Sequence, residues 1–178
     1  EDRLVATTET PHAKVGEFAF LKAVAISRFG AFLDWGLPKD LLVPFREQKS
    51  DMVEGRSYMV YIFLDYQTNR IAASAKLDKF LDHTPPEYET GDEVQLIITD
   101  ETDLGYKAII NEEHWGMLYK NQVFQPLLVG QKVAGFISKV REDEKIDLLL
   151  EKPGYEKVDA ISEKILNELK ANNGFLAV

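Results

Sequence analysis

The sequence of 178 residues contains no cysteine. Disulfide bonds and thiolate metal sites are therefore excluded, and a reducing compartment, the cytoplasm, is expected. No apolar run approaches the roughly 18 residues that a membrane-spanning helix requires. The three histidines, His12, His83 and His114, do not have metal-ligand spacing. We therefore expect neither a metal centre nor a membrane partner.

Signatures of catalysis are also lacking. The sequence has no Gly-rich loop that would cradle phosphates and no nucleophile elbow. The acidic clusters EEH at 112–114 and REDEK at 141–145 are typical of solvated turns rather than of an acid–base pair. His114, next to Trp115, is more typical of a turn residue than of a general base. The sequence therefore predicts a protein with no catalytic residues and no cofactor.

Positive charge is scarce, with 21 Lys and Arg against 30 Asp and Glu and a net charge of -9. Phosphate contacts depend on Lys and Arg, so this balance argues against an indiscriminate polyanion binder. The charge is unevenly distributed. Residues 15–80 hold nine basic and eight acidic residues, a balance of +1, whereas residues 81–152 hold seven and fifteen, a balance of -8. A nucleic-acid site is therefore expected in the first of these segments.

An internal repeat organises the chain. A shift of 75 residues aligns three glycine pairs and two pairs near the end of each copy: Gly16 with Gly91, Gly30 with Gly105, Gly55 with Gly130, Arg70 with Lys145, and Ile71 with Ile146. Three glycine coincidences in one register are not expected by chance, since glycine makes up about 7% of an average sequence. The repeat predicts two domains of the same plan.

Each copy is predicted to contain five short strands. In the first copy they cover 18–26, 31–36, 40–45, 57–65 and 71–76, and in the second 93–99, 105–111, 116–120, 132–140 and 145–152. Short strands separated by Gly-marked turns favour a small barrel, and five strands match the OB architecture. Little helix is expected inside either copy, apart from a short turn near 46–51.

The fold class predicted is therefore mainly β, with tandem five-stranded OB-type barrels at 15–76 and 91–152. Residues 1–14 are interpreted as the last strand of a preceding copy and a linker, because RLVATT at 3–8 resembles RIAASA at 70–75. With no initiator Met, we expect the start of the protein to be missing. Residues 77–90 form a linker that Pro85 and Pro86 stiffen. Helical periodicity predicts a short helical segment within 153–178, the start of a truncated third domain.

These landmarks resemble the S1 RNA-binding domain. The matching segments of the first copy are VGEF at 15–18, FGAF at 29–32, DLLVPF at 40–45 and DYQTNRIAAS at 65–74. The tandem copies, the FGAFLDWGLPKDLLVPF stretch, the LGYKAII and HWGMLY segments and the trailing helix together resemble the conserved virulence factor B family. That resemblance implies several S1 domains followed by a C-terminal winged helix, and a bacterial protein that binds RNA and regulates gene expression. Residues 155–178 would open the winged helix.

The resemblance also implies a binding surface on the first copy. S1 domains stack bases on two Phe and a His, beside an Asp and an Arg near the last turn. On this chain the two Phe, the Asp and the Arg fall on Phe29, Phe32, Asp65 and Arg70, while the His position falls on Val43, a departure. Lys22 and Arg28 are nearby candidates for phosphate contacts. Such a surface suits single-stranded RNA, because unpaired bases stack on exposed aromatic rings.

The second copy has a weaker form of this pattern. Leu104 and Lys107 replace the two Phe, and Tyr119 and Lys145 take the His and Arg positions. Tyr106 is an additional candidate platform. With fewer aromatics and a charge balance of -8, this copy is expected to bind RNA less well, or to act as a spacer or a protein-binding barrel.

Other readings stay open from the sequence. Phe29 and Phe32 are also compatible with packing at a barrel corner, and Arg70 with a solvated turn. The protein would then be an interaction adaptor with acidic barrels, whose contact with nucleic acid is incidental. DNA binding by the complete winged helix is a third possibility. The oligomeric state is not determined by the sequence.

Overall fold

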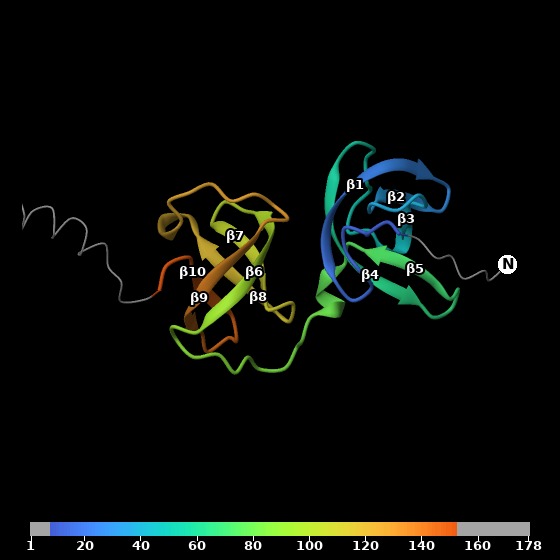
Figure 1. Ribbon diagram of the computed structural model, residues 1–178. Helices are drawn as coiled ribbons and strands as arrows, with labels where there is room; N and C mark the ends of the chain where they lie inside the picture. The colour runs from blue at the N-terminus through green and yellow to red at the C-terminus, as the bar shows by residue number, and fades with distance from the viewer. Residues whose placement is uncertain (1–7, 153–178) are drawn as a thin grey trace, which may run out of the picture.

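The computed structural model describes residues 8–152 and shows two β bodies joined by a connecting segment (Figure 1). The strand expected from a preceding copy lies outside the described residues except for Thr8. The expected winged-helix segment at 153–178 lies wholly outside them. Within residues 8–152 the helices are short 3-10 turns of three or four residues. The described part of the chain is therefore mainly β, as predicted.

The first body is a curled sheet of five strands in the order β3-β2-β1-β4-β5. Its elements in chain order are β1 (Phe18–Ser27), β2 (Gly30–Asp34), β3 (Leu41–Pro44), the 3-10 turn η1 (Phe45–Glu47), β4 (Ser57–Asp65) and β5 (Arg70–Ser74). All of its paired strands are antiparallel. A second 3-10 turn, η2 (Leu77–Phe80), follows β5.

The second body is a closed barrel with strand order β10-β8-β7-β6-β9. Its elements are β6 (Glu93–Glu101), β7 (Gly105–Ile110), β8 (His114–Tyr119), the 3-10 turn η3 (Lys120–Gln122), β9 (Lys132–Val140) and β10 (Ile146–Leu149). A parallel ladder between β8 and β10 closes the barrel, while the other pairs are antiparallel.

The 75-residue repeat of the sequence recurs in the backbone hydrogen bonds. Equivalent amides and carbonyls pair in both copies: Gly16 N with Ile62 O and Gly91 N with Ile137 O, both at 2.8 Å, and Gly55 N with Ala23 O at 2.8 Å and Gly130 N with Ile98 O at 2.7 Å. A bulge also interrupts β1 and β6 at equivalent positions, between Ala23 and Ala25 and between Ile98 and Asp100. Residues 75 apart therefore occupy the same structural position.

Gly30 and Gly105 show why the repeat conserves glycine at the start of β2 and β7. A Cβ at Gly30 would lie 2.1 Å from the carbonyl oxygen of Val43, and one at Gly105 would lie 1.9 Å from that of Leu118. Their φ angles are 147° and 157°, which L side chains rarely adopt. A side chain at either position would push β2 from β3, or β7 from β8.

The first sheet differs from the expected closed barrel. Its strands β3 and β5 lie side by side, but no ladder joins them. Pro44, at the end of β3, stands where the second copy has Tyr119, and proline has no N–H to donate. Closure is limited to the far end of β5, where Ala75 N donates to Glu47 O at 2.9 Å. The first body is thus a half-barrel.

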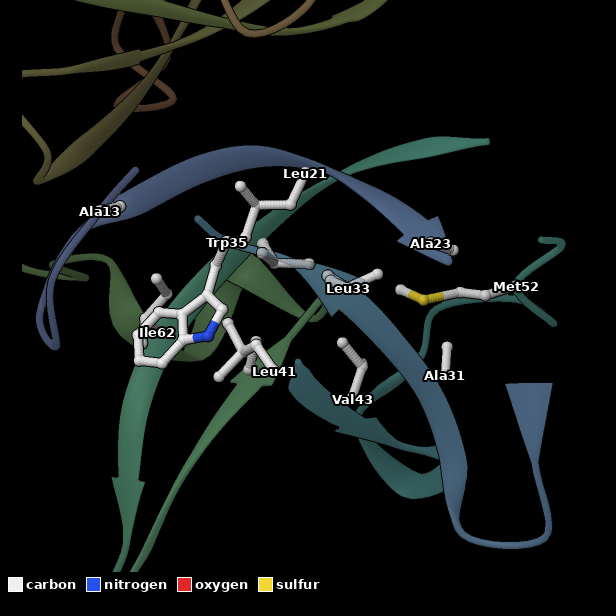
Figure 2. Packing of buried hydrophobic residues seen from close by; sticks show 12 residues of the cluster. Ala13, Leu21, Ala23, Ala31, Leu33, Trp35, Leu41, Val43, Met52 and Ile62 are labelled. Carbon is white, nitrogen blue, oxygen red and sulfur yellow. The ribbon is translucent and has the colours of Figure 1, made fainter. Parts of the chain in front are cut away.

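The core of the first body lies inside the curled sheet (Figure 2). Leu33, Val43 and Ile62 are fully buried there. Trp35 joins them with 8% of its surface exposed, and its Nε1 donates to Lys39 O at 2.7 Å, which ties the loop after β2 to the core. The outward residues of β2 and β3 are thereby held on a rigid layer.

A third cluster joins the two bodies. Leu77 of η2 and Leu81, which begin the connection predicted at 77–90, are buried against Ile97 and Ile109 of the second barrel and Met59 of the first. Figure 1 shows η2 between the two bodies. The contact is apolar and involves both sheets, so the beginning of the connecting segment is part of the hydrophobic packing.

Candidate nucleic-acid interface

The outer face of β2 carries one of the predicted aromatics. Strand alternation turns Ala31 and Leu33 into the core and Phe32 outward, where its side chain is half-buried. Phe32 pairs with Leu42 of β3 on one side and with Ala25 of β1 on the other. Its ring therefore lies on the outside of the sheet.

Lys22 lies further along this outer face. It is exposed on β1 and pairs with Asp34 of β2. The same alternation that turns Phe32 outward places Lys22 and Asp34 on the solvent side. The outer face of β1, β2 and β3 thus combines a half-buried aromatic ring with a lysine and a carboxylate.

Two exposed phenylalanines lie at the end of the β2–β3 pair. The ladder ends with Gly30 opposite Pro44, so Phe29 and Phe45 are the next residues in that register. Their exposed fractions are 59% and 50%. At the equivalent place in the second copy, Lys120 N donates to Leu104 O at 3.1 Å, which shows that the register continues by one residue there. Phe29 and Phe45 are therefore both exposed to solvent at the same end of the β2–β3 pair.

An arginine accompanies each of these rings. The guanidinium carbon of Arg28 lies 4.7 Å from the centroid of the Phe29 ring, within the range of a cation–π contact. Arg46 follows Phe45 in η1 and is exposed. Phe29 and Arg28 were predicted from the sequence, whereas Phe45 and Arg46 were not. The available signal was the Phe-Arg dipeptide directly after DLLVP, at the end of a strand that faces FGAF.

Asp65 pairs with Arg46 rather than with Arg70. Its Oδ2 accepts a hydrogen bond from Arg46 Nη2 at 3.2 Å, and its Oδ1 accepts one from Gln67 N at 3.0 Å. The backbone bond from Gln67 is the main cause that lowers the pKa of Asp65, with further help from Thr68 and the charge of Arg46. Asp65 therefore stays ionised and orients Arg46.

Arg70 lies opposite Asp65 in the β4–β5 ladder and is exposed. It begins β5, whereas Ser74, at the other end of that strand, donates its hydroxyl to Glu47 O of η1 at 3.4 Å. Asp65 is thus both the ion-pair partner of Arg46 and the ladder neighbour of Arg70.

A shallow groove of about 540 Å³ adjoins Arg46 on the outer side of β4. Phe63 and Phe80 contribute aromatic rings to it, and Lys79 Nζ lies 4.9 Å from the Phe80 centroid and 5.4 Å from that of Phe63. Lys79 also forms an ion pair with Glu47. Burial by itself would raise the pKa of Glu47, but the bonds from Lys79 and Ser74 hold it below the ordinary value. This pair fixes η1, and with it Arg46, to η2.

The same outer face is covered in the second barrel. Ile97 and Ile109 are buried under η2, and Trp115 Nε1 donates to Asp78 Oδ1 at 2.8 Å. The three residues 75 positions earlier are polar and exposed: Lys22, Asp34 and Asp40. The first copy thus leaves open, among the described residues, the face that the second copy uses for packing.

The candidate side chains of the second copy have different surroundings. Tyr106 faces the core of the barrel, with 9% of its surface exposed, and pairs with Leu118. Its ring therefore does not form the surface platform that was expected from the sequence. Tyr119 OH accepts a hydrogen bond from Arg141 Nη2 at 2.6 Å. Lys145 Nζ is paired with Asp143 at 2.7 Å, on the β9–β10 turn.

Val43, at the expected histidine position of the first copy, is fully buried in the core. The outward residues of β3 are Leu42 and Pro44. Because position 43 faces the core, its side chain does not reach the outer face of the sheet.

Within residues 8–152, no group of three or more His, Asp or Glu side chains is arranged to hold a metal ion. The same residues contain no helix long and apolar enough to cross a membrane. His114 contacts Tyr88 OH through Nδ1 at 3.4 Å and Thr84 O through Nε2 at 3.2 Å. The roles visible for His114 are thus contacts with the connecting segment.

No protein-family model and no curated protein sequence matches the chain. Among solved structures, it is similar to a multidomain protein with nucleic acid binding domains from Streptococcus pneumoniae, at 19% identity and a TM-score of 0.46. That match covers 96% of this chain, which spans 64% of the length of the other.

Two further similarities cover smaller parts of the chain. One is to an uncharacterised protein from Methanocaldococcus jannaschii, with 21% identity, a TM-score of 0.33, and coverage of 40% of this chain and 100% of the other. The other is to a chain of an a/eIF2alpha–aDim2p–rRNA complex from Pyrococcus horikoshii, with 20% identity, a TM-score of 0.35, and coverage of 49% and 59%.

Proposed function

We propose that the first body binds single-stranded RNA at the end and along the outer face of β2 and β3. The observation that carries this proposal is the pair of exposed rings, Phe29 and Phe45, each with an arginine as its neighbour. A chain with a net charge of -9 has few cations to place. Because arginines lie next to exposed aromatic rings here, the surface favours a ligand that has both planar bases and negative charge.

Each part of this surface has a role in binding an unpaired strand. Phe29 and Phe45 offer ring faces on which bases stack, worth about 1–3 kcal/mol for each stacked base. Arg28 and Arg46 lie where they can contact the phosphates of the same nucleotides, and Lys22 extends the positive charge along the outer face. The half-buried Phe32 supplies apolar contact behind the strand.

The contrast between the copies supports one RNA site of this type per chain. The equivalents of Phe29 and Phe45 in the second barrel are Leu104 and Lys120, and Lys120 is paired with Glu101 at 3.3 Å. The outer face next to them is packed against η2. We therefore propose that the second barrel positions the first rather than binding a strand in the same way.

The biological role that we propose is regulation of gene expression after transcription, in the bacterial cytoplasm. Its support is the resemblance to the conserved virulence factor B family and the absence of cysteine. DNA binding by a complete winged helix would add a second nucleic-acid contact in the whole protein.

The test is a titration of the protein with a fluorescently labelled single-stranded RNA of twelve nucleotides at low salt. Phe29→Ala and Phe45→Ala should each weaken binding by about 1–3 kcal/mol, that is roughly 5- to 150-fold. Leu104→Ala is the matched control, because Leu104 is 67% exposed at the position equivalent to Phe29. It should leave the affinity unchanged.

The salt dependence gives a second criterion. Three phosphate contacts predict a slope of roughly -2 for the logarithm of affinity against that of salt concentration. Absence of binding to any oligonucleotide at low salt would overturn the proposal in favour of a protein-interaction adaptor.

A further inference from the structure

A second cleft, of about 860 Å³, lies between the two bodies. Its walls come from β1 and β4 of the first, from the segment after η1, from η2, and from β6, β7 and β8 of the second. Its volume is in the range of small-molecule sites, about 300–1,000 Å³. The cleft shares no lining residue with the Phe29–Phe45 end, so it is a separate place on the molecule.

Lysines dominate the charge of this cleft. Lys49, Lys76, Lys79 and Lys107 line it, against two carboxylates, Asp78 and Asp100. Lys79 is paired with Glu47. Among the described residues, none of the other three lysines forms an ion pair. In a chain of net charge -9, the cleft is therefore a place where positive charge slightly exceeds negative charge.

Lys107 is the most constrained of these lysines. Its Nζ lies 3.5 Å from the centroid of the Trp115 ring, and its side chain is half-buried. Burial is the main cause that lowers the pKa of Lys107, and the positive charge of Lys49 lowers it further, while Asp78 and Asp100 oppose this. An anion between Lys49 and Lys107 would remove their repulsion and favour the charged form of Lys107.

Apolar surface accompanies the lysines. Phe20 lines the cleft with 41% of its surface exposed, and its side chain packs on Gly130 of the second barrel. Trp115 lies on the opposite wall beneath Lys107, with Nε1 fixed by Asp78. A ligand in the cleft would thus meet cations and an aromatic ring together, which suits a phosphate attached to a base.

We propose that the cleft between the two bodies is a nucleotide-binding site distinct from the RNA surface of the first body. The phosphate would lie between Lys49 and Lys107, and the base against Phe20. The phosphorylated nucleotide is either a free mononucleotide or one residue of a strand, and these sources share the same chemistry. The site requires both bodies, because Lys49 and Phe20 belong to the first and Lys107 to the second.

Tryptophan fluorescence provides the measurement, since the two tryptophans are in different environments. Trp115 lines the cleft, whereas Trp35 is buried in the core of the first body. The intact chain is titrated at low salt with AMP and, separately, with an unlabelled single-stranded RNA of twelve nucleotides. The variants are Lys49→Gln, Lys107→Gln and Trp115→Phe. Lys139→Gln, on an exposed position of β9, is the matched control.

The expected result is a saturable change in fluorescence that Trp115→Phe abolishes. Lys49→Gln and Lys107→Gln should each weaken binding by roughly tenfold, the usual effect of losing one charge-assisted contact, while Lys139→Gln has no effect. If Lys107→Gln alters the circular dichroism spectrum, Lys49→Gln carries the test, because Lys49 is exposed. A response to AMP identifies a site for free nucleotide, and a response to RNA alone identifies a residue of a strand.

The proposal is overturned if neither ligand changes the fluorescence of Trp115, or if Lys49→Gln binds both as the unaltered protein does. The variant Phe29→Ala distinguishes failure of the cleft site from failure of the proposed RNA surface. Loss of RNA affinity in Phe29→Ala, with the AMP response intact, supports two independent sites. An AMP response that disappears in Phe29→Ala contradicts a separate cleft site.

Discussion

Asp34 on β2 and Ile109 on β7 occupy the same position in the two copies, yet Asp34 is exposed and Ile109 is fully buried. Both residues lie at equivalent positions of equivalent strands, β2 and β7. The difference is η2, which covers Ile109 and has no counterpart among the described residues over Asp34. The same outer face of the sheet is thus exposed to solvent in the first copy and packed against η2 in the second.

Because of this contrast, replacement by asparagine should have very different effects on the free energy of unfolding at Ile109 and at Asp34. Ile109→Asn should lower the free energy of unfolding by about 3–5 kcal/mol, because it removes apolar burial and places an amide among apolar neighbours. Asp34→Asn keeps the oxygen that accepts a hydrogen bond from Gly36 N at 3.0 Å and should change stability by less than about 0.5 kcal/mol. Urea denaturation of both variants measures the difference, and similar losses would refute the assignment of the packing face.

Gly30 is predicted to be the most sensitive glycine at the Phe29–Phe45 end. Gly30→Ala should destabilise the protein by at least about 2 kcal/mol, because the added Cβ meets backbone atoms that cannot turn aside. Gly55→Ala is the matched comparison. It also has a positive φ, of 86°, but no atom lies within 4 Å of its Cβ position, so a loss of about 1 kcal/mol is expected. Thermal denaturation should rank the two variants in this order.

The Glu47–Lys79 pair makes stability depend on acid pH. The pKa of Glu47 is lowered on folding from an ordinary value of 4.5, so its contribution is present above that value and is lost as the pH falls through the lowered pKa. Lys79→Met should cost about 1 kcal/mol at pH 7, a modest loss because Lys79 is 44% exposed to screening solvent. The loss should shrink as the pH falls below 4.5 and through the lowered pKa, because Glu47 then takes up a proton. Losses that are equal at pH 7 and at acid pH would contradict this role of the pair.

Much of the fold could be predicted from the sequence because the repeat is carried by residues with strict conformational demands. Gly30 and Gly105 are needed wherever a strand begins in close contact with its neighbour, so their 75-residue spacing aligned all five strands of the copies. The alternation in SYMVYIFLD likewise identified β4. The open edge of the first sheet was not foreseen, because it depends on whether residues 41–43 of β3 form a ladder with residues 71–73 of β5, as their equivalents do in the second copy.

The candidate site was predicted less completely, since its members meet through register rather than through sequence proximity. Phe45 comes to the same end of the sheet as Phe29 only because the ladder ends at Gly30 and Pro44. Asp65 finds Arg46, 19 residues away, and not the ladder neighbour Arg70. Tyr106 looked like a platform in GYKAII, but its pairing with Leu118 turns it into the core.

Binding of RNA to the first body at the Phe29–Phe45 end can be located by ultraviolet crosslinking. A single-stranded RNA is crosslinked to the intact protein, and the crosslinked peptides are mapped. We expect crosslinks at Phe29, Phe45 and Phe32, and their loss when Phe29 and Phe45 are both replaced by alanine. Crosslinks confined to residues 91–152, or unchanged in the double variant, would show that RNA does not bind at this end.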